Sequence, residues 1–384
     1  MARSASHTPD IHFQPRAFHP ASWLPGPHFQ TIGGKFLRPR PDLGAERLTI
    51  ETPDGDFLDL DLGPDPGEDA PVVVVLHGLE GSTARSYMKV AMWEITRRGM
   101  RAIGMNFRSC SGRPNRLPRF YHSGDTGDLA FLLEVLGDRF PDRRLGAMGF
   151  SLGGNVLLRY LGDVSTGAPA ELRAAVAISV PFDLREGTRR LEERRMGRVY
   201  THYFLRSLRR KALAKQEILG DVLDLERVMA ARTLREFDDA ATAPLHGFRD
   251  AWEYYELASS APVLPRIRVP TLLLHALDDP FLPPEAVPVD AARESPWLLG
   301  VFPPLGGHVG FVEDGSPLHP RFWAESEGAR YLSEALDAPG ANDATAAGTA
   351  AEDAGDASEG TSGGVRGGSA GASSRGPEAP NAPA

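Results

Sequence analysis

Short apolar runs alternate with helical patterns through most of the chain. The runs lie at residues 72–76, 101–106, 145–150, 174–178, 271–274 and 297–302. A run that is apolar without alternation is typical of a strand buried on both faces of a parallel sheet. Residues 85–98, 125–136, 152–161 and 321–336 instead carry apolar side chains at helical spacing. Strands that alternate with helices predict an α/β fold with a mostly parallel, doubly wound sheet.

Two further patterns refine the first half of the chain. Residues 48–52 and 57–62 flank the turn sequence Pro53-Asp54-Gly55, and the second run alternates strictly between apolar and acidic residues. This pattern predicts a β-hairpin with one face in water. Asp125 precedes the helical pattern that ends near Leu136, so we expect it to cap that helix.

The interval between the strand that ends near Val180 and the strand that begins near Val269 spans roughly 90 residues, far more than a crossover needs. Its helical composition predicts a cap, residues 185–262, inserted between the two parts of the core, residues 42–184 and 263–337. The cap is rich in arginine. Either these arginines pair with acids such as Glu186, Glu192 and Glu193, which we favour, or they face an anionic substrate or a membrane surface.

The two ends of the chain differ in composition. Residues 13–41 are rich in proline, histidine and aromatic residues, whose apolar surface would be costly to leave in water. We therefore expect residues 1–41 to form an arm packed over the core. Residues 338–384 are almost entirely Gly, Ala, Ser, Asp, Glu, Thr and Pro, which predicts a disordered low-complexity tail.

Composition excludes several classes of protein. The chain has 384 residues, 41% hydrophobic, and a net charge of −9, so no overall positive field would attract nucleic acid. Its single cysteine, Cys110, excludes an internal disulfide framework and a cysteine-rich zinc site. Metal-binding and nucleotide-binding motifs are missing, so we expect no cofactor and no metal.

The same sequence predicts a cytoplasmic protein. The first ten residues carry no apolar core typical of a signal peptide, and no stretch approaches the roughly 18 apolar residues of a membrane helix. Peripheral contact with a membrane stays open, and nothing indicates the oligomeric state.

The candidate nucleophile is Ser151, in the sequence Gly149-Phe150-Ser151-Leu152-Gly153 between a buried strand and a helix. Small residues on both sides let the chain reverse sharply while the serine adopts a strained backbone conformation. This pattern is typical of a nucleophile elbow, which exposes the serine above the sheet and aims the next amide at a developing oxyanion.

A serine needs a base, and the base needs a carboxylate to orient it. Asp278 and Asp279 follow the strand at 271–274, where ligands bind in open α/β sheets. We prefer Asp279, with Asp278 as the alternative. His308 follows the last strand on the glycine-rich loop Gly306-Gly307-His308-Val309-Gly310, which makes it the candidate base.

The expected oxyanion hole consists of two backbone amides. One belongs to Leu152, and the other is expected from Leu79 in His77-Gly78-Leu79-Glu80-Gly81-Ser82, the loop after the strand at 72–76. His77 is expected to anchor that loop without transferring a proton, and Cys110 is expected to be a buried structural thiol.

These motifs together resemble one family, the YheT-type branch of the α/β-hydrolases, also called type 4. The resemblance covers about residues 13–336 and rests on residues 27–31, 77–82, 106–112, 121–124, 149–155, 181–184, 278–281 and 307–311. One departure is Ser109, where family members often have glycine. The resemblance implies an α/β-hydrolase fold and hydrolysis of carboxylic esters, with eukaryotic relatives acting on lipid esters.

The sequence therefore predicts a serine esterase with Ser151, His308 and Asp279 as its triad, an acyl-enzyme intermediate and a small-molecule ester, acyl or lipid-like, as its substrate. A thioesterase or an amidase could use the same residues, because the triad serves several acyl groups. A non-catalytic binding protein that retains the fold is the third hypothesis.

Overall fold

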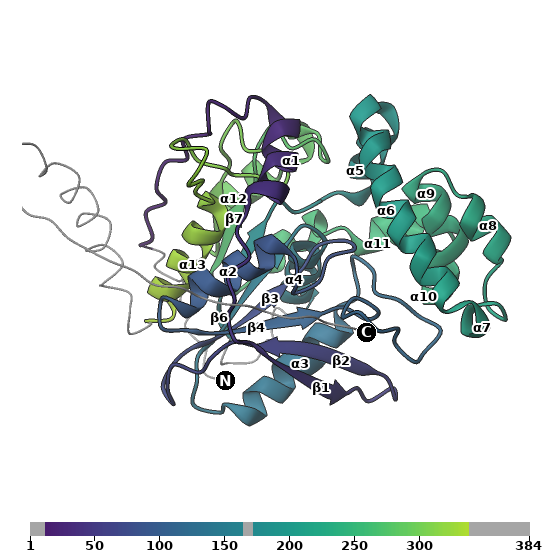
Figure 1. Cartoon of the computed structure of the whole chain (residues 1–384), viewed down its shortest axis with the longest axis horizontal. Helices are drawn as coiled ribbons and strands as arrows, with labels where there is room; N and C mark the ends of the chain where they lie inside the picture. Colours follow the sequence, from purple (N-terminus) through teal and green to yellow (C-terminus); the bar gives the residue numbers. More distant parts are fainter. Residues whose placement is uncertain (1–11, 164–171, 338–384) are drawn as a thin grey trace, which may run out of the picture. The chain divides into compact units, whose positions relative to one another are not determined.

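The computed structural model describes residues 12–163 and 172–337, and an eight-stranded sheet forms its centre (Figure 1). The order of strands is β1-β2-β4-β3-β5-β6-β7-β8, with β3 to β8 parallel and β1 and β2 antiparallel at one edge. The strands are β1 (Glu46–Glu51), β2 (Phe57–Leu62), β3 (Val72–Leu76), β4 (Arg101–Asn106), β5 (Leu145–Phe150), β6 (Leu172–Ile178), β7 (Thr271–Leu274) and β8 (Leu298–Val301). The predicted α/β fold with a mostly parallel sheet is confirmed.

Helices cover both faces of the sheet, and strand β3 shows why its sequence has no polar residue. Val72 and Val74 pack into the core shared with α3 (Gly127–Arg139) and α4 (Leu152–Asp163), whereas Val73 and Val75 pack on the opposite side with α2 (Ser86–Thr96) and α13 (Trp323–Ala335). Successive side chains of a strand point to opposite faces, so a strand covered on both sides must be apolar throughout.

Between β6 and β7 the chain forms a group of helices that Figure 1 shows gathered together in teal and green. They are α5 (Leu184–Glu193), α6 (Arg195–Ala214), α7 (Gln216–Leu219), α8 (Leu225–Ala230), α9 (Leu234–Phe237), the π-helix η1 (Asp238–Thr242), α10 (Ala243–His246) and α11 (Ala251–Ala258). We call this segment the cap. The short helices η2 (Ala261–Arg266), η3 (Pro284–Ala286) and α12 (Val289–Glu294) belong to the connections around β7.

The predicted hairpin is present, and its water-facing side is found on β1, where Arg47, Thr49 and Glu51 are exposed, but not on β2. Strand β2 is buried along most of its length, and the carboxylate of Asp59 is covered because Arg113 donates to it at 2.6 and 2.9 Å. The acidic positions of the alternating pattern therefore hold ion pairs, not water. Strand β2 also pairs with β4, which joins the hairpin to the sheet.

The predicted capping role of Asp125 is also wrong. Helix α3 begins after Thr126, whose side chain makes no capping hydrogen bond. Asp125 instead accepts a hydrogen bond of 2.7 Å from Arg119. A charged partner within reach outcompetes the local capping bond that sequence spacing suggests.

The described part of the N-terminal segment packs against the C-terminal end of the fold through helix α1 (Pro27–Leu37) and the residue that follows it. The Arg38 guanidinium donates to Glu325 on α13 at 2.5 Å, and both side chains are almost completely buried. Arg38 also donates to the carbonyl oxygens of Val309 and Gly310. Residues 1–11 of the predicted arm, and the predicted tail at 338–384, lie outside the described residues.

This buried ion pair gives a prediction about stability. Replacing Arg38 with methionine leaves the Glu325 carboxylate buried without its partner, which costs about 3–5 kcal/mol of unfolding free energy. Arg293→Met is the matched control, because Arg293 and Asp290 form an exposed pair whose loss costs less than about 1 kcal/mol. Denaturant unfolding of both variants measures the difference, and equal stabilities would contradict the prediction.

Candidate active site

Ser151 occupies the turn between β5 and α4, and its backbone conformation is strained, with φ of +51°. Close packing of neighbouring backbone explains the glycines around it. A Cβ atom on Gly149 would lie 2.5 Å from the carbonyl oxygen of Gly153, and one on Gly153 would lie 2.6 Å from that of His77. Any larger residue at either position would push the turn away from the sheet. The pattern that identified the turn therefore reflects packing as well as φ.

His308 joins Ser151 to Asp279 in one chain of hydrogen bonds. Its Nε2 lies 3.0 Å from Ser151 Oγ, and its Nδ1 lies 2.8 Å from Asp279 Oδ2. The carboxylate is fully buried and is held from its other side by the amide of Phe281, which donates to Oδ1 at 2.8 Å. Because an ionised carboxylate only accepts hydrogen bonds, the proton lies on Nδ1 and leaves Nε2 free to accept the serine proton.

The two neighbouring aspartates have different environments. Burial acts to raise the pKa of Asp279, but the charge and hydrogen bond of His308 outweigh it, so the pKa lies below its usual value. Asp278 instead accepts a hydrogen bond of 2.9 Å from the amide of Gly307, and burial raises its pKa. The structure therefore brings Asp279 to the histidine and uses Asp278 to hold the loop that carries it.

The loop around His308 is fixed by residues far away in the sequence. None of these residues was given a role from the sequence. The His308 amide donates to Thr31 Oγ1 on α1 at 2.9 Å, and the Val309 amide donates to Ser179 Oγ at 2.9 Å. The ring of Phe281 stacks on the imidazole, with centroids 4.0 Å apart and planes 15° apart. The only signal for Thr31 was its place in the resemblance, at residues 27–31, which gave it no role.

The loop after β3 lies close to Ser151 and is held on several sides. His77 is fully buried: its Nδ1 lies 2.8 Å from the carbonyl oxygen of Gly78, and its Nε2 accepts from the Phe107 amide at 3.2 Å. The Gly78 amide donates to the Tyr87 hydroxyl at 2.9 Å. These bonds use both nitrogens of His77 for anchoring the loop.

Two amides beside Ser151 are available to a ligand. Among the described residues, the amides of Leu79 and Leu152 donate a hydrogen bond to no other group. Both residues line the same cavity as Ser151. Buried amides are normally paired, so two free ones next to a nucleophilic hydroxyl form a candidate oxyanion site.

The residue after Leu79 connects this loop to the cap. Glu80 has a positive φ of +54°, and its amide donates to the Tyr121 hydroxyl at 2.7 Å. Its carboxylate accepts a hydrogen bond of 2.8 Å from Lys211 on α6. Lys211 also lies 2.9 Å from Cys110 Sγ, and burial raises the pKa of that thiol, so Cys110 stays protonated.

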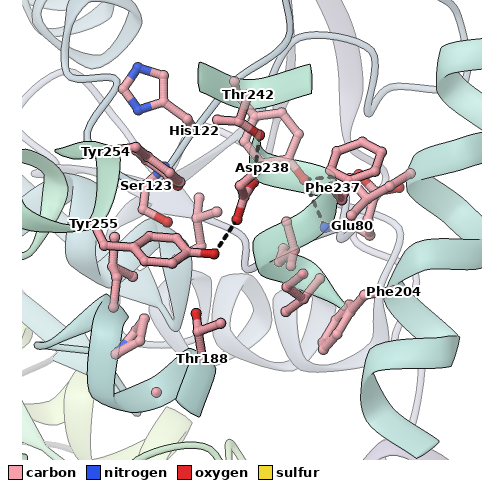
Figure 2. Close-up of a pocket in the computed structure, with 18 of the residues that line it drawn as sticks. Glu80, His122, Ser123, Thr188, Phe204, Phe237, Asp238, Thr242, Tyr254 and Tyr255 are labelled. Carbon is pink, nitrogen blue, oxygen red and sulfur yellow. Dashed lines mark hydrogen bonds between the residues drawn. The ribbon is translucent and has the colours of Figure 1, made fainter. Parts of the chain in front are cut away.

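Two cavities meet at Ser151. The first, which we call the cap pocket, is enclosed mainly by residues of α5 to α11 and holds about 1080 Å³ of empty space, part of it open to solvent (Figure 2). The second, which we call the arm pocket, lies between α1 and α6 and holds about 1350 Å³ of empty space, part of it open to solvent. Ser151, Leu79, Glu80, Phe204 and Phe281 line both. An ester whose carbonyl carbon lies at Ser151 could therefore extend one arm into each pocket.

No group of three His, Cys, Asp or Glu side chains in residues 12–163 and 172–337 is arranged to hold a metal ion. Within the same residues, none of the helices has the length and apolar character to cross a membrane.

Comparison with known proteins agrees with this geometry. The alpha/beta hydrolase fold family matches residues 71–315. YheT of Escherichia coli (strain K12), named provisionally as an esterase, is 38% identical over 315 residues, which are 81% of this chain and 91% of YheT. The chain therefore belongs to the α/β-hydrolase family. The identity to YheT over most of both chains confirms the predicted YheT-type branch.

Other relatives carry names of lipid-ester hydrolases. The monoacylglycerol lipase of Saccharomyces cerevisiae (strain ATCC 204508 / S288c) is 34% identical over 68% of this chain and 59% of its own length. Phospholipase ABHD3 of Homo sapiens is 29% identical over 77% of this chain and 74% of its own length. Among solved structures, the Pyrococcus furiosus esterase Pf2001 has a TM-score of 0.50 at 17% identity, covering 76% of this chain and 93% of that one. This last likeness shows the fold alone.

Two buried histidines near the site predict a loss of stability in acid. Burial lowers the pKa of His77 to about 3 and that of His275 to about 4, the second against the opposing charge of Asp279. In the unfolded chain both would take up a proton near pH 6.5. The free energy of unfolding is therefore at its full value above that pH, and it falls as the pH drops toward the pKa values of the folded protein. At pH 5 each histidine costs about 2 kcal/mol.

His275→Gln tests this, because glutamine does not titrate. Neither ring nitrogen of His275 has a hydrogen-bond partner among the described residues, so the substitution breaks no hydrogen bond. Denaturant unfolding at pH 5 and pH 7 measures how much unfolding free energy is lost in acid. That loss should be smaller in the variant than in the wild type by about 2 kcal/mol. The same pH dependence in variant and wild type would contradict the assignment.

Proposed function

We propose that this protein is a serine hydrolase that cleaves carboxylic esters through an acyl-enzyme intermediate, with Ser151, His308 and Asp279 as the catalytic triad. The observation that carries the proposal is the continuous chain of hydrogen bonds from the buried carboxylate through the imidazole to the serine hydroxyl, at 2.8 and 3.0 Å. The two free amides beside the serine support it. The names of the relatives support an ester as the substrate.

In the first half of the reaction, Ser151 Oγ attacks the ester carbonyl carbon while His308 Nε2 takes the hydroxyl proton. The carboxylate of Asp279 stays ionised and stabilises the imidazolium, and the amides of Leu79 and Leu152 donate to the oxyanion. His308 then gives the proton to the departing alcohol, which leaves the acyl group on Ser151. Water repeats these steps in the second half and releases the carboxylic acid.

The walls of the two pockets support an apolar substrate. Leucine and phenylalanine side chains dominate the cap pocket, including Leu184, Leu208 and Phe237. Burial of apolar surface contributes roughly 25 cal/mol per Å², so a pocket of this composition favours an acyl chain over a polar group. A thioester or an amide could use the same triad, because the apolar walls favour the acyl chain and the triad serves several acyl groups.

The first test is Ser151→Ala. Loss of the nucleophile should lower kcat for p-nitrophenyl esters by about 10⁶-fold and abolish labelling by a fluorophosphonate probe. The melting temperature of the variant serves as the control for folding. Hydrolysis at the wild-type rate by the variant would refute the proposal, and wild-type turnover of acyl-CoA well above that of oxyesters would reassign the enzyme as a thioesterase.

The second test separates the two neighbouring aspartates. Asp279→Asn should lower kcat by about 10⁴-fold, because the amide cannot hold the imidazole in the required tautomer. Asp278→Asn keeps an oxygen acceptor for the Gly307 amide and should retain most of the activity. Comparison of kcat at one pH measures both effects, and a larger loss for Asp278→Asn would show that the wrong carboxylate has been assigned.

We further propose that the enzyme takes its substrate from an anionic lipid surface. On α1, exposed Phe29, Ile32 and Phe36 follow helical spacing and form one apolar stripe, with Phe36 75% exposed. Val199 and Tyr203 on α6 are also exposed. Four of these five residues line the arm pocket, which also contains Ser151 and His308. The apolar rim therefore surrounds an entrance to the site.

The charges around this rim fit an anionic partner. Seven exposed cations on or near the two helices make no ion pair within 4.0 Å among the described residues, namely Lys35, Arg40, Arg194, Arg195, Arg198, Arg206 and Arg210. The expected pairing of cap arginines with acids occurs at Arg189, which lies near Glu186 and Glu193, and Glu192 pairs with Arg235. A cation near an anionic membrane gains about 1 kcal/mol.

Cosedimentation of the full chain with vesicles tests this. Vesicles of phosphatidylglycerol should bind at least ~10-fold more protein than vesicles of phosphatidylcholine, and salt should weaken the binding. The double variant Phe29→Ser, Phe36→Ser should bind the phosphatidylglycerol vesicles about 10-fold more weakly or worse, because burial of each phenylalanine contributes roughly 1.5–3 kcal/mol. Leu318→Ser is the control, since Leu318 is 84% exposed but does not line either pocket. Equal binding by all three proteins would exclude the lipid surface.

A further inference from the structure

Besides Glu80 and Lys211, which pair with each other, the cap pocket carries a polar cluster in the wall formed by the cap. Asp238, Thr242 and Tyr255 form this cluster, and all three line the pocket (Figure 2). None of them contacts the catalytic hydrogen bonds described above. A carboxyl group in a pocket otherwise suited to an acyl chain needs an explanation, because burying it is costly unless it has partners.

The carboxyl group of Asp238 has partners but keeps capacity for more. Thr242 Oγ1 donates to Oδ1 at 2.5 Å, and the Tyr255 hydroxyl donates to Oδ2 at 2.7 Å. A carboxylate offers about four acceptor positions, so these bonds leave about two. Asp238 lines the pocket, and the residue as a whole is not completely buried.

The charge state of Asp238 fits a role as an acceptor. Burial raises its pKa to about 6, against the two hydrogen bonds, and the neighbouring carboxylate of Asp239 adds to the rise. The carboxylate form therefore predominates at neutral pH. Two histidines in the same wall, His122 and His246, are neutral there, because burial lowers the pKa of each to about 3. Neither supplies a positive charge that would neutralise Asp238.

The backbone at Asp238 is also unusual. Residues Asp238–Thr242 form a single turn of π-helix between α9 and α10, and the Ala243 amide donates to the Asp238 carbonyl oxygen five residues back. Such turns are rare and often occur at functional sites. A purely structural network would explain the bonds to Thr242 and Tyr255, but it would not require Asp238 to line the pocket.

We propose that Asp238 is a specificity-determining residue that accepts a hydrogen bond from a hydroxyl group on the acyl chain held in the cap pocket. The substrate class is then esters of hydroxylated acyl chains. This inference rests on the proposed esterase function. A hydroxyl group would gain a charge-assisted hydrogen bond, whereas a methyl group at the same place would remove water from the carboxylate without replacing it. Sites of this kind discriminate strongly against the analogue that lacks the donor.

The experiment compares matched pairs of p-nitrophenyl esters on the full chain. Each pair has one chain that ends in a hydroxyl group and one that ends in a methyl group at the same position, from 6-hydroxyhexanoate with heptanoate to 12-hydroxydodecanoate with tridecanoate. In the wild type, kcat/KM should favour the hydroxylated ester by about 10-fold or more at the length that reaches Asp238. In Asp238→Leu the preference should reverse at that length.

Leu245→Ala is the matched control, because Leu245 lines the same pocket without a polar group and should change both members of a pair alike. If Asp238→Leu does not fold, Asp238→Asn measures the same ratio, which should fall toward one. If a folded, active Asp238 variant keeps the wild-type ratio of kcat/KM values at every chain length, the proposed role of Asp238 is wrong, and the esterase function is unaffected. A wild type that hydrolyses neither member of any pair would instead refute the esterase function.

Discussion

The contact between the His308 imidazole and the Ser151 hydroxyl is the interaction on which the rest of the site depends, and it is made between two loops separated by 157 residues in sequence. Neither residue lies within a regular strand or helix of its own. The serine is fixed because glycine backbone packs tightly around its turn, and the histidine is fixed because its loop is bonded to α1, to the end of β6 and to Asp278. The sheet supplies a rigid frame, and the loops use it to place reactive atoms within hydrogen-bonding distance.

The parts of the fold that depend on local pattern were predictable from the sequence. Strands such as β3 are apolar on both faces because helices cover both. The glycines around Ser151 are needed because neighbouring backbone packs too closely there for a side chain. The order of Ser151, Asp279 and His308 is also readable, because each follows a strand and the carboxyl ends of parallel strands meet at one edge.

The parts that depend on long-range partners were not predictable. Thr31 bonds a residue 277 positions away, and no local pattern marks that contact. Asp125 and Asp59 were misjudged because each meets an arginine that sequence spacing does not bring near it. Adjacent Asp278 and Asp279 bond to different atoms of the His308 loop, and that difference is a property of the folded backbone. No pattern in the sequence marked the polar cluster of Asp238, Thr242 and Tyr255.

Phe281 connects features that have so far been treated separately. Its ring stacks on His308, contacts Tyr200 and Phe204 of the cap, and lines both pockets. One side chain that lines both pockets is therefore also the one that stacks on the imidazole. A mutation that widened either pocket at this position would also loosen the base, so selection for a new substrate is expected to proceed through the outer cap residues, where shape can change without disturbing the proton transfer.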